Sequence, residues 1–211
     1  MDVLRSNADP RSETFQANRA GFLEQIGILN EQLALLRLAG GEKYVQRHVA
    51  RGKLMARERI ELLLDRDAPF LELSTLAAWG TDYHVGASLV TGIGVVSGVE
   101  VVLVAHDPTV RGGASNPYTW KKVLRAMQIA RENRLPVINL VESGGGDLTS
   151  QADLFIPAGQ LFHDLTELSA LGIPTIALVF GNSTAGGAYV PGMCDYSVMV
   201  DRGAKVFLGG P

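Results

Sequence analysis

Cysteine and histidine are both scarce in this sequence. Among its 211 residues there is one cysteine, Cys194, and there are four histidines. A single thiol cannot form a disulfide within the chain, and it excludes a zinc site built from several cysteines. His48 has no second histidine nearby at ligand spacing, so we predict no metal site. Cys194 lies in an apolar stretch, which predicts a buried, unreactive thiol.

Long apolar runs and long basic runs are also missing. No apolar stretch reaches the length that crosses a bilayer. The net charge of −3 without a basic run argues against nucleic acid as a partner. The first residues include Asp2, Asp9 and Glu13, unlike a signal peptide or an acid-poor transit peptide. We therefore expect a cytoplasmic protein (bacterial cytosol, or the mitochondrial matrix in a eukaryote) with no membrane or nucleic-acid partner.

The composition is that of a globular core, with 46% hydrophobic and 19% charged residues. Its length suits one large domain, or one domain with an appendage. We expect a helical extension over residues 1–40, with a polar, frayed start at 1–13, and a domain over 41–211. From Thr14 to Ala39 an apolar stripe has spacings of three, four and seven residues and predicts a packing helix, against this chain or another subunit. The stripe consists of Phe15, Phe22, Ile26, Leu29, Leu33 and Leu36.

Two apolar runs are each followed by a glycine loop. The run at 137–141 precedes the loop at 143–148, and the run at 175–180 precedes the loop at 183–188. Each loop opens a predicted helix. Buried strands of this kind predict parallel neighbours in an α/β unit, with both loops at the edge where ligands bind. Upstream, the pattern predicts a β-hairpin formed by residues 89–96 and 99–106. A third glycine loop is predicted over residues 111–117. We predict helices over about 118–133 and 157–171.

In such loops the functional groups are those of the backbone rather than of side chains. Glycine allows a ligand to approach the main chain, and free N–H groups at a helix start carry partial positive charge. Two such groups together form an oxyanion hole, which suits a thioester that becomes an enolate. Each loop alone could equally be a simple tight turn, but two in tandem favour a function.

Residues 42–66 are the most basic part of the chain. Interleaved acids make a solvated helical surface the default interpretation, and a cation cluster could also bind the phosphates of a nucleotide-bearing ligand. The cations are Lys43, Arg47, His48, Arg51, Lys53, Arg57, Arg59 and Arg66.

Several long motifs resemble one family in the correct order. The chain from Gly41 is similar to the N-terminal domain of the carboxyltransferase (β) subunit of biotin-dependent acyl-CoA carboxylases, in the crotonase superfamily. The stretches that carry the resemblance are RHVARGKLMARERIELLLD (47–65), VTGIGVVSGVEV (90–101), VRGGA (110–114), VESGGGDLTSQADLF (141–155), TAGGAYVPGMCD (184–195) and KVFLGGP (205–211).

The resemblance implies a fold, a reaction and site residues. The fold would be α/β and crotonase-like (ClpP/crotonase), a spiral of β-β-α units with an N-terminal helical extension. The reaction would transfer CO₂ from carboxybiotin, carried by a biotin carboxylase α subunit, to an acyl-CoA enolate. Gly186 and Gly187 would hold the thioester oxyanion, with Gly145 and Gly146 opposite. Residues expected to contact the CoA or acyl group are Arg51, Lys53, Arg57, Gly112, Gly113, Ala114, Ala185, Ala188 and Tyr189.

The acyl group is expected to be methylcrotonyl-like. GGEKYVQRH (40–48), Leu148 and Gln151 resemble methylcrotonyl-CoA carboxylases, and the chain lacks the four-cysteine module of the bacterial acetyl-CoA enzyme. Gly146-Asp147-Leu148 departs from the methylcrotonyl pattern and could admit a longer chain such as geranyl. Propionyl-CoA and acetyl-CoA carboxyltransferases stay open as alternatives.

Other functions on this fold also remain open. A hydratase, isomerase or thioesterase would use Glu142 or Asp147 as acid or base. A serine peptidase would use Ser143 or Ser183 with His163. A non-catalytic scaffold that only uses the fold is the third alternative.

The last residues, 206–211, read as a strand entering another glycine turn, which predicts a fragment of a longer polypeptide. In the resembled family the hole for the biotin carbonyl lies in a C-terminal domain of another subunit. We therefore expect this chain alone to be inactive, and the assembled protein to be a homo-oligomer, expected as a hexamer, with its α partner.

Overall fold

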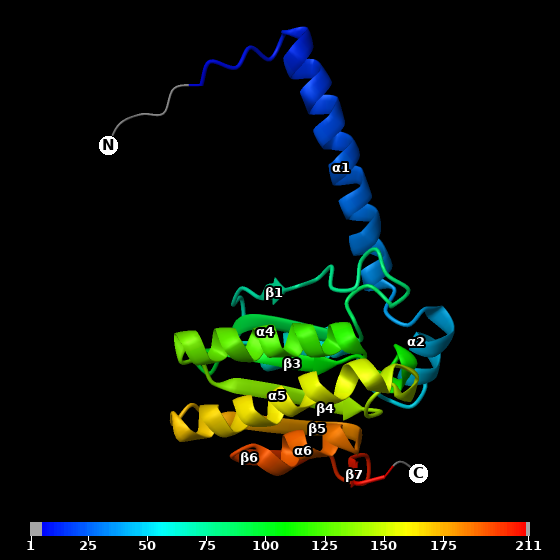
Figure 1. The fold of residues 1–211 in the computed structure, drawn as a ribbon, viewed down its shortest axis with the longest axis vertical. Helices are drawn as coiled ribbons and strands as arrows, with labels where there is room; N and C mark the ends of the chain where they lie inside the picture. The colour runs from blue at the N-terminus through cyan, green and yellow to red at the C-terminus, as the bar shows by residue number, and fades with distance from the viewer. Residues whose placement is uncertain (1–5, 210–211) are drawn as a thin grey trace.

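The computed structural model describes residues 6–209, so the first five residues of the start predicted to be frayed (1–13), and the end of the glycine turn predicted at 206–211, lie outside the described residues. Its centre is a seven-stranded sheet of order β1-β2-β3-β4-β5-β6, with β7 also paired to β5 (Figure 1). The strands are β1 Leu71–Leu73, β2 Leu89–Val96, β3 Val99–His106, β4 Val137–Ser143, β5 Thr175–Thr184, β6 Tyr196–Met199 and β7 Lys205–Phe207. The helices are α1 Glu13–Arg37, α2 Glu42–Val49, α3 Ala56–Leu63, α4 Pro117–Asn133, α5 Gln151–Ala170 and α6 Gly186–Met193.

The predicted hairpin is confirmed. β2 and β3 pair antiparallel, and Val96 faces Val99 across the turn. Ser97 and Gly98 have φ values of 52° and 77°, as a two-residue turn between right-twisted strands requires. From β3 onward the sheet is parallel, because α4, α5 and α6 cross back between successive strands.

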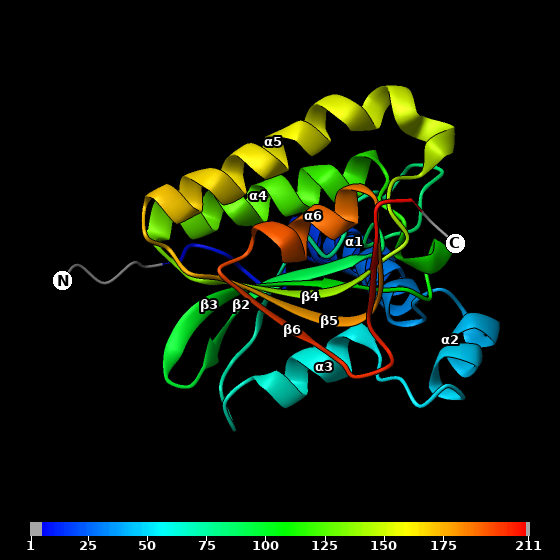
Figure 2. The same cartoon turned by 90° about the horizontal axis from the view of Figure 1, so that it is seen from below.

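Helices cover both faces of the sheet (Figure 2). On one face α4, α5 and α6 pack with Val102 and Val104 of β3, and on the other α3 packs with Val101 and Leu103. Alternate side chains of a strand point to opposite faces, which is why one apolar strand supplies both cores. On α5, Leu161, Leu165 and Leu168 are all buried.

The expected start of α5 was wrong by six residues, since the helix begins at Gln151 and holds Pro157 in its interior. The Asp147 carboxylate accepts hydrogen bonds from the N–H and hydroxyl of Thr149, which caps a short 3₁₀ turn over Leu148–Ser150. This turn runs directly into α5. Helix growth from that cap therefore outweighs the one main-chain bond that proline cannot make.

α1 extends away from the sheet and its helices (Figure 1). Its expected length is confirmed within two residues at its end, but packing within the chain is limited. Leu36 is the buried residue of this helix, and Phe22 is 72% exposed. Among residues 6–209, no helix combines the length and apolarity needed to cross a bilayer.

Candidate functional site

Three loops meet at the carboxyl edge of the parallel strands. Ser143 at the end of β4 lies beside Ser183 near the end of β5. The N–H of Ser115, in the loop after β3, donates to Gly145 O at 2.8 Å, and the N–H of Asp147 donates to Ser115 O at 2.8 Å. The prediction that the glycine loops share one edge is therefore confirmed, and the 111–117 loop joins them.

The turn from β5 into α6 has an unusual backbone. β5 continues to Thr184, four residues beyond the predicted strand, and α6 begins at Gly186. Between them Ala185 has φ 50° and ψ −118°, a conformation that suits glycine. The Ser183 hydroxyl donates to Gly187 O at 2.8 Å and holds the turn.

The first N–H groups of α6 have no partner within the helix. Among the described residues we find no acceptor for the N–H groups of Gly186 and Gly187. In the facing loop the Gly145 N–H donates to the Ser143 hydroxyl at 3.2 Å, whereas the Gly146 N–H has no acceptor among residues 6–209. The arrangement offers main-chain donors to a ligand oxygen.

Several glycines of these loops are packed too closely for a larger residue, whereas Gly186 is not. A Cβ on Gly187 would lie 2.7 Å from the Ser143 hydroxyl, and a Cβ on Gly145 would lie 3.2 Å from Thr184 O. A Cβ on Gly113 would overlap Glu142 O. A Cβ on Gly186 would meet no atom within 4 Å. Gly186 therefore faces open space beside the donors.

A basic pocket of about 400 Å³ adjoins these loops. It is lined by Tyr44, Arg47, His48, Arg51, Lys53, Pro108, Thr109, Gly112, Glu142 and Asn182. Of the three predicted phosphate-binding cations, Arg51 and Lys53 lie here. Arg57 does not, because it pairs with Glu72 at 2.5 Å and lines a different surface hollow with Phe70.

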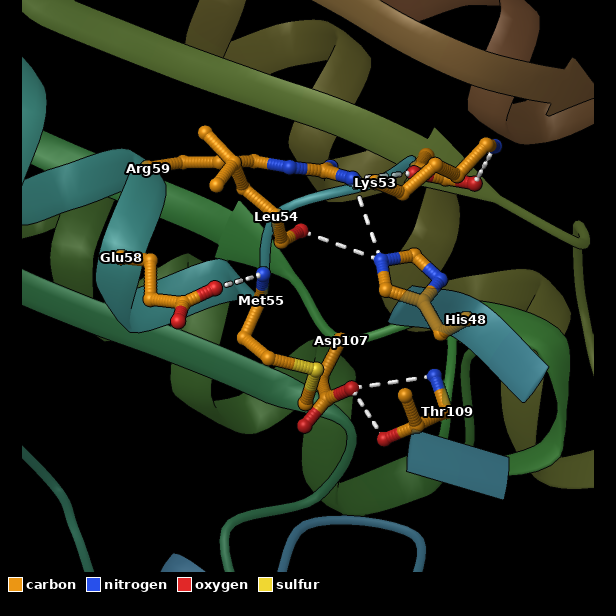
Figure 3. A network of polar contacts seen from close by, with 9 residues as sticks. His48, Lys53, Leu54, Met55, Glu58, Arg59, Asp107 and Thr109 are labelled. Carbon is orange, nitrogen blue, oxygen red and sulfur yellow. Dashed lines mark hydrogen bonds and ion pairs between the residues drawn. The ribbon is translucent and has the colours of Figure 1, made fainter. Parts of the chain in front are cut away.

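A buried ion cluster forms one wall of the pocket. The Glu142 carboxylate contacts both Lys53 and Arg59, with 2.7 Å to Arg59 Nη2. His48 Nε2 lies 3.0 Å from Leu54 O, and Figure 3 shows His48, Lys53 and Arg59 converging from α2, α3 and the segment between them. The Arg59 guanidinium also lies over the Phe180 ring at 4.5 Å. The default interpretation of residues 42–66 as a solvated surface was wrong for Arg59, because its guanidinium is buried against Glu142.

The Asp147 side chain also makes structural contacts. Its carboxylate pairs with Arg111 Nη1 at 2.7 Å and with the Thr149 hydroxyl. The hydrogen bond from that hydroxyl is the main reason that the pKa of Asp147 is lowered, and Arg111 lowers it further. The pair joins the 111–117 loop to the 143–148 loop.

A small cavity of about 30 Å³ adjoins the loops. Its walls include Ser143, Gly186, Gly187, Leu161 and His106. Burial lowers the pKa of His106 from 6.5 to about 4, so the ring is neutral at pH 7.

The remaining predicted residues lie around the turn. Ala114 follows Gly113 in the joined loop, and Ala188 donates its N–H to Ala185 O at 2.9 Å. The Tyr189 ring is half exposed and packs on Phe162 of α5, with centroids 4.9 Å apart.

The groups required by a serine peptidase do not assemble as that alternative needs. The Ser143 and Ser183 hydroxyls bond within the loops, while His163 is exposed and contacts Gln160 and Asp164 of its own helix. His163, Asp164 and Glu167 form a cluster of metal-type ligands on the surface of α5, where Glu167 already pairs with Arg131 at 2.6 Å.

Cys194 behaves as predicted for an inert thiol. It is partly buried, and burial raises the pKa of its thiol to about 11.

Sequence reasoning missed Tyr44, Asn182 and Arg111 as members of this region. It offered one signal for Arg59, which shares a face of α3 with the buried Ala56 and Ile60. Tyr44, Asn182 and Arg111 carry no local pattern that would distinguish them from surface residues.

Comparison with known families gives a match over most of the chain. The model described as the carboxyl transferase domain matches residues 47–211. The chain is 62% identical over 209 residues to a probable biotin-dependent acyl-coenzyme A carboxylase beta2 subunit of Mycobacterium tuberculosis, covering 99% of this chain and 40% of that protein. It is 47% identical to a probable mitochondrial methylcrotonoyl-CoA carboxylase beta chain of Drosophila melanogaster, covering 100% of this chain and 37% of that protein.

Solved structures of proteins with related names also superpose on this chain. The beta subunit of geranyl-CoA carboxylase from P. aeruginosa superposes with a TM-score of 0.82 at 40% identity, over 100% of this chain and 40% of that chain. A chain of the transcarboxylase 12S structure, which is described as a hexamer assembly, superposes with a TM-score of 0.80 at 29% identity, over 88% of this chain and 37% of that chain. The chain thus spans about 40% of the length of these relatives.

These matches confirm the resemblance to acyl-CoA carboxylase β subunits and the expected crotonase-like α/β fold. The domain boundary at residue 40 and the roles of the site residues stay predictions. The chain belongs to the carboxyl transferase domain family.

Proposed function

We propose that this chain forms the acyl-CoA-binding part of a carboxyltransferase centre in a biotin-dependent acyl-CoA carboxylase. The observation that supports it best is the pair of free N–H groups at Gly186 and Gly187, with open space at Gly186 and a basic pocket beside the loops.

The thioester carbonyl would lie at the start of α6. There the two N–H groups and the positive end of the helix would stabilise the oxygen as it becomes an enolate. Loss of one such donor raises the barrier of comparable reactions by about 3 kcal/mol. The close packing of Gly187 on Ser143 would keep the donors from shifting.

The absence of a free acid or base in the loops suits this reaction. Within the described residues Glu142 is neutralised by Lys53 and Arg59, and Asp147 by Arg111. A hydratase needs an available carboxylate, whereas carboxybiotin, when bound, supplies both the CO₂ and the group that accepts the proton. Of this chain's residues, Gly145 and Gly146 would face that group.

The nucleotide end of CoA would occupy the basic pocket. Arg47 and Arg51 line it, and both would bind phosphate there. Lys53 would contribute less, because its ammonium group already contacts the Glu142 carboxylate.

We propose a branched, unsaturated acyl-CoA as substrate, with 3-methylcrotonyl-CoA or geranyl-CoA as the leading candidates. Names of both kinds occur among the relatives. Partners would be a biotin carboxylase α subunit and further copies of this chain, in the cytoplasm or the mitochondrial matrix.

Equilibrium binding of 3-methylcrotonyl-CoA, propionyl-CoA and free CoA tests the proposal. Gly186→Val places its Cβ in open space, and the side chain should weaken acyl-CoA binding at least tenfold. Gly192→Val is the matched control, because Gly192 lies in the same helix with nothing within 4 Å. It should bind like the wild type.

Arg51→Ala tests the nucleotide end. It should weaken all three ligands alike, because the pocket would bind the part that they share. Unchanged acyl-CoA binding in Gly186→Val, or no binding to the folded wild-type chain, would contradict the proposal.

A further inference from the structure

The small cavity beside the glycine loops lies between the sheet and the helices that cover one of its faces. Its walls come from β3 and β4 and from α4, α5 and α6, the helix layer above the sheet in Figure 2. Val104, Val123, Leu161 and Val190 form much of its lining. Its volume of about 30 Å³ is far below the roughly 300 Å³ at which ligand pockets begin. One water molecule needs only about 10–15 Å³ on the same measure, so the cavity has room for one or two.

Two buried nitrogen atoms on these walls have no hydrogen-bond partner among residues 6–209. They are Nε1 of Trp120, on α4, and Nδ1 of His106, at the end of β3. Trp120 is only 7% exposed, and its indole N–H can act only as a donor. Buried polar atoms are nearly always paired with the protein or with ordered water. Two unpaired nitrogens on one small cavity therefore indicate a polar occupant.

The Ser143 hydroxyl offers a third polar group on the same walls. It accepts the Gly145 N–H at 3.2 Å, whereas its own hydrogen bond to Gly113 O is 3.5 Å long. Hydrogen bonds from a hydroxyl to an oxygen are usually about 2.5–3.0 Å long, so this proton can pair better with a nearer acceptor. A buried water typically makes about three hydrogen bonds, and these walls provide three partners.

We propose that the cavity binds an ordered water molecule, which accepts the Trp120 indole N–H and pairs with His106 Nδ1 and the Ser143 hydroxyl. Water suits this set because it both donates and accepts, so it can pair with Nδ1 in either tautomer of the neutral ring. An apolar occupant would leave both nitrogens unpaired. Gly186 and Gly187 also line the cavity, so the water would lie beside the turn from β5 into α6. This inference does not depend on the proposed function.

Cross-relaxation between water and indole protons, measured by NMR on the isotope-labelled chain, tests the site directly. The chain has two tryptophans and so gives two indole N–H signals, and Trp120→Phe identifies the buried one. The Trp120 indole proton should show cross-relaxation with a long-lived water, with the sign that separates it from proton exchange. Trp79, which is 48% exposed, is the matched control and should show only exchange or short-lived water. A Trp120 signal without this cross-peak would overturn the proposal.

Substitution of His106 tests the bridge between the two nitrogens. His106→Leu removes Nδ1 and should weaken the Trp120 cross-peak by about threefold or more, because the water loses one of its partners. His163→Leu makes the same change at an exposed ring on α5 and should leave the cross-peak unchanged. Equal cross-peaks in the two variants would remove His106 from the site and refute the bridge. The wild-type spectrum decides whether water is bound even if His106→Leu does not fold.

Discussion

At the scale of single residues, Glu142 links two elements beside the site. It comes directly before the 143–148 loop and joins β4 to Arg59 of α3 and to Lys53. Gly181 makes this possible, because a Cβ there would lie 2.5 Å from a Glu142 carboxylate oxygen. A glycine inside a buried strand is thus explained by the side chain that passes it.

We predict that Glu142→Gln destabilises the fold by about 3 kcal/mol or more, since it leaves the buried Arg59 without a counter-charge. Glu72→Gln is the control, because its partner Arg57 is 35% exposed and such pairs contribute about 1 kcal/mol or less. Urea unfolding measures both. Equal losses would show that burial of the Glu142 cluster has no special cost.

At the scale of elements, the turn between β5 and α6 determines where the free N–H groups point. Ala185 adopts φ 50° and ψ −118°, and this lets α6 begin at Gly186 directly after the strand. Such a conformation costs a non-glycine residue about 1–3 kcal/mol. The strain is maintained by the bonds from Ala185 N–H to Phe207 O and from the Ser183 hydroxyl to Gly187 O.

Two alanine-to-glycine substitutions three residues apart should therefore have opposite effects. Ala185→Gly relieves the strain and should stabilise the chain by about 1 kcal/mol after the entropy of the unfolded glycine is counted. Ala188→Gly lies within α6 and should destabilise it by up to about 1 kcal/mol. Thermal unfolding of both variants is the measurement, and changes of the same sign would contradict the strain argument.

At the scale of the whole molecule, the free energy of unfolding should decrease as the pH becomes acidic. The folded pKa of His106 is about 4 and the unfolded value is 6.5, so the unfolded chain binds an extra proton between these values. Stability is therefore highest above pH 6.5 and falls as the pH decreases to 4, by on the order of 3 kcal/mol. The lowered pKa of Asp147 adds a further loss at lower pH, as that carboxylate protonates.

The pH prediction is checked by urea unfolding from pH 7 to pH 4. His106→Gln should flatten the decline in that window. His163→Gln, at an exposed ring on α5, should leave the decline as in the wild type. A wild-type stability that is constant from pH 7 to 4 would disprove the assignment.

Much of the fold could be predicted because its signals are local. The hairpin at 89–106, the buried strands β4 and β5 and the glycine loops that follow them were each predicted from a few consecutive residues. The end of a strand or a turn depends mainly on neighbours in the chain. The start of α5 was missed because Pro157 is a strong local signal, and the Asp147 cap overrides it from ten residues away.

The sequence by itself determined the order of the strands and helices, the glycine loops and the seven-residue repeat of α1, because each is encoded by spacing along the chain. Only the tertiary structure decided which cations reach the site. It places Arg51 in the basic pocket, turns Arg57 to Glu72, and buries Arg59 against Glu142, which lies 83 residues further on. The physical reason is that burial and charge pairing arise between elements distant in sequence, after the helices have packed on the sheet.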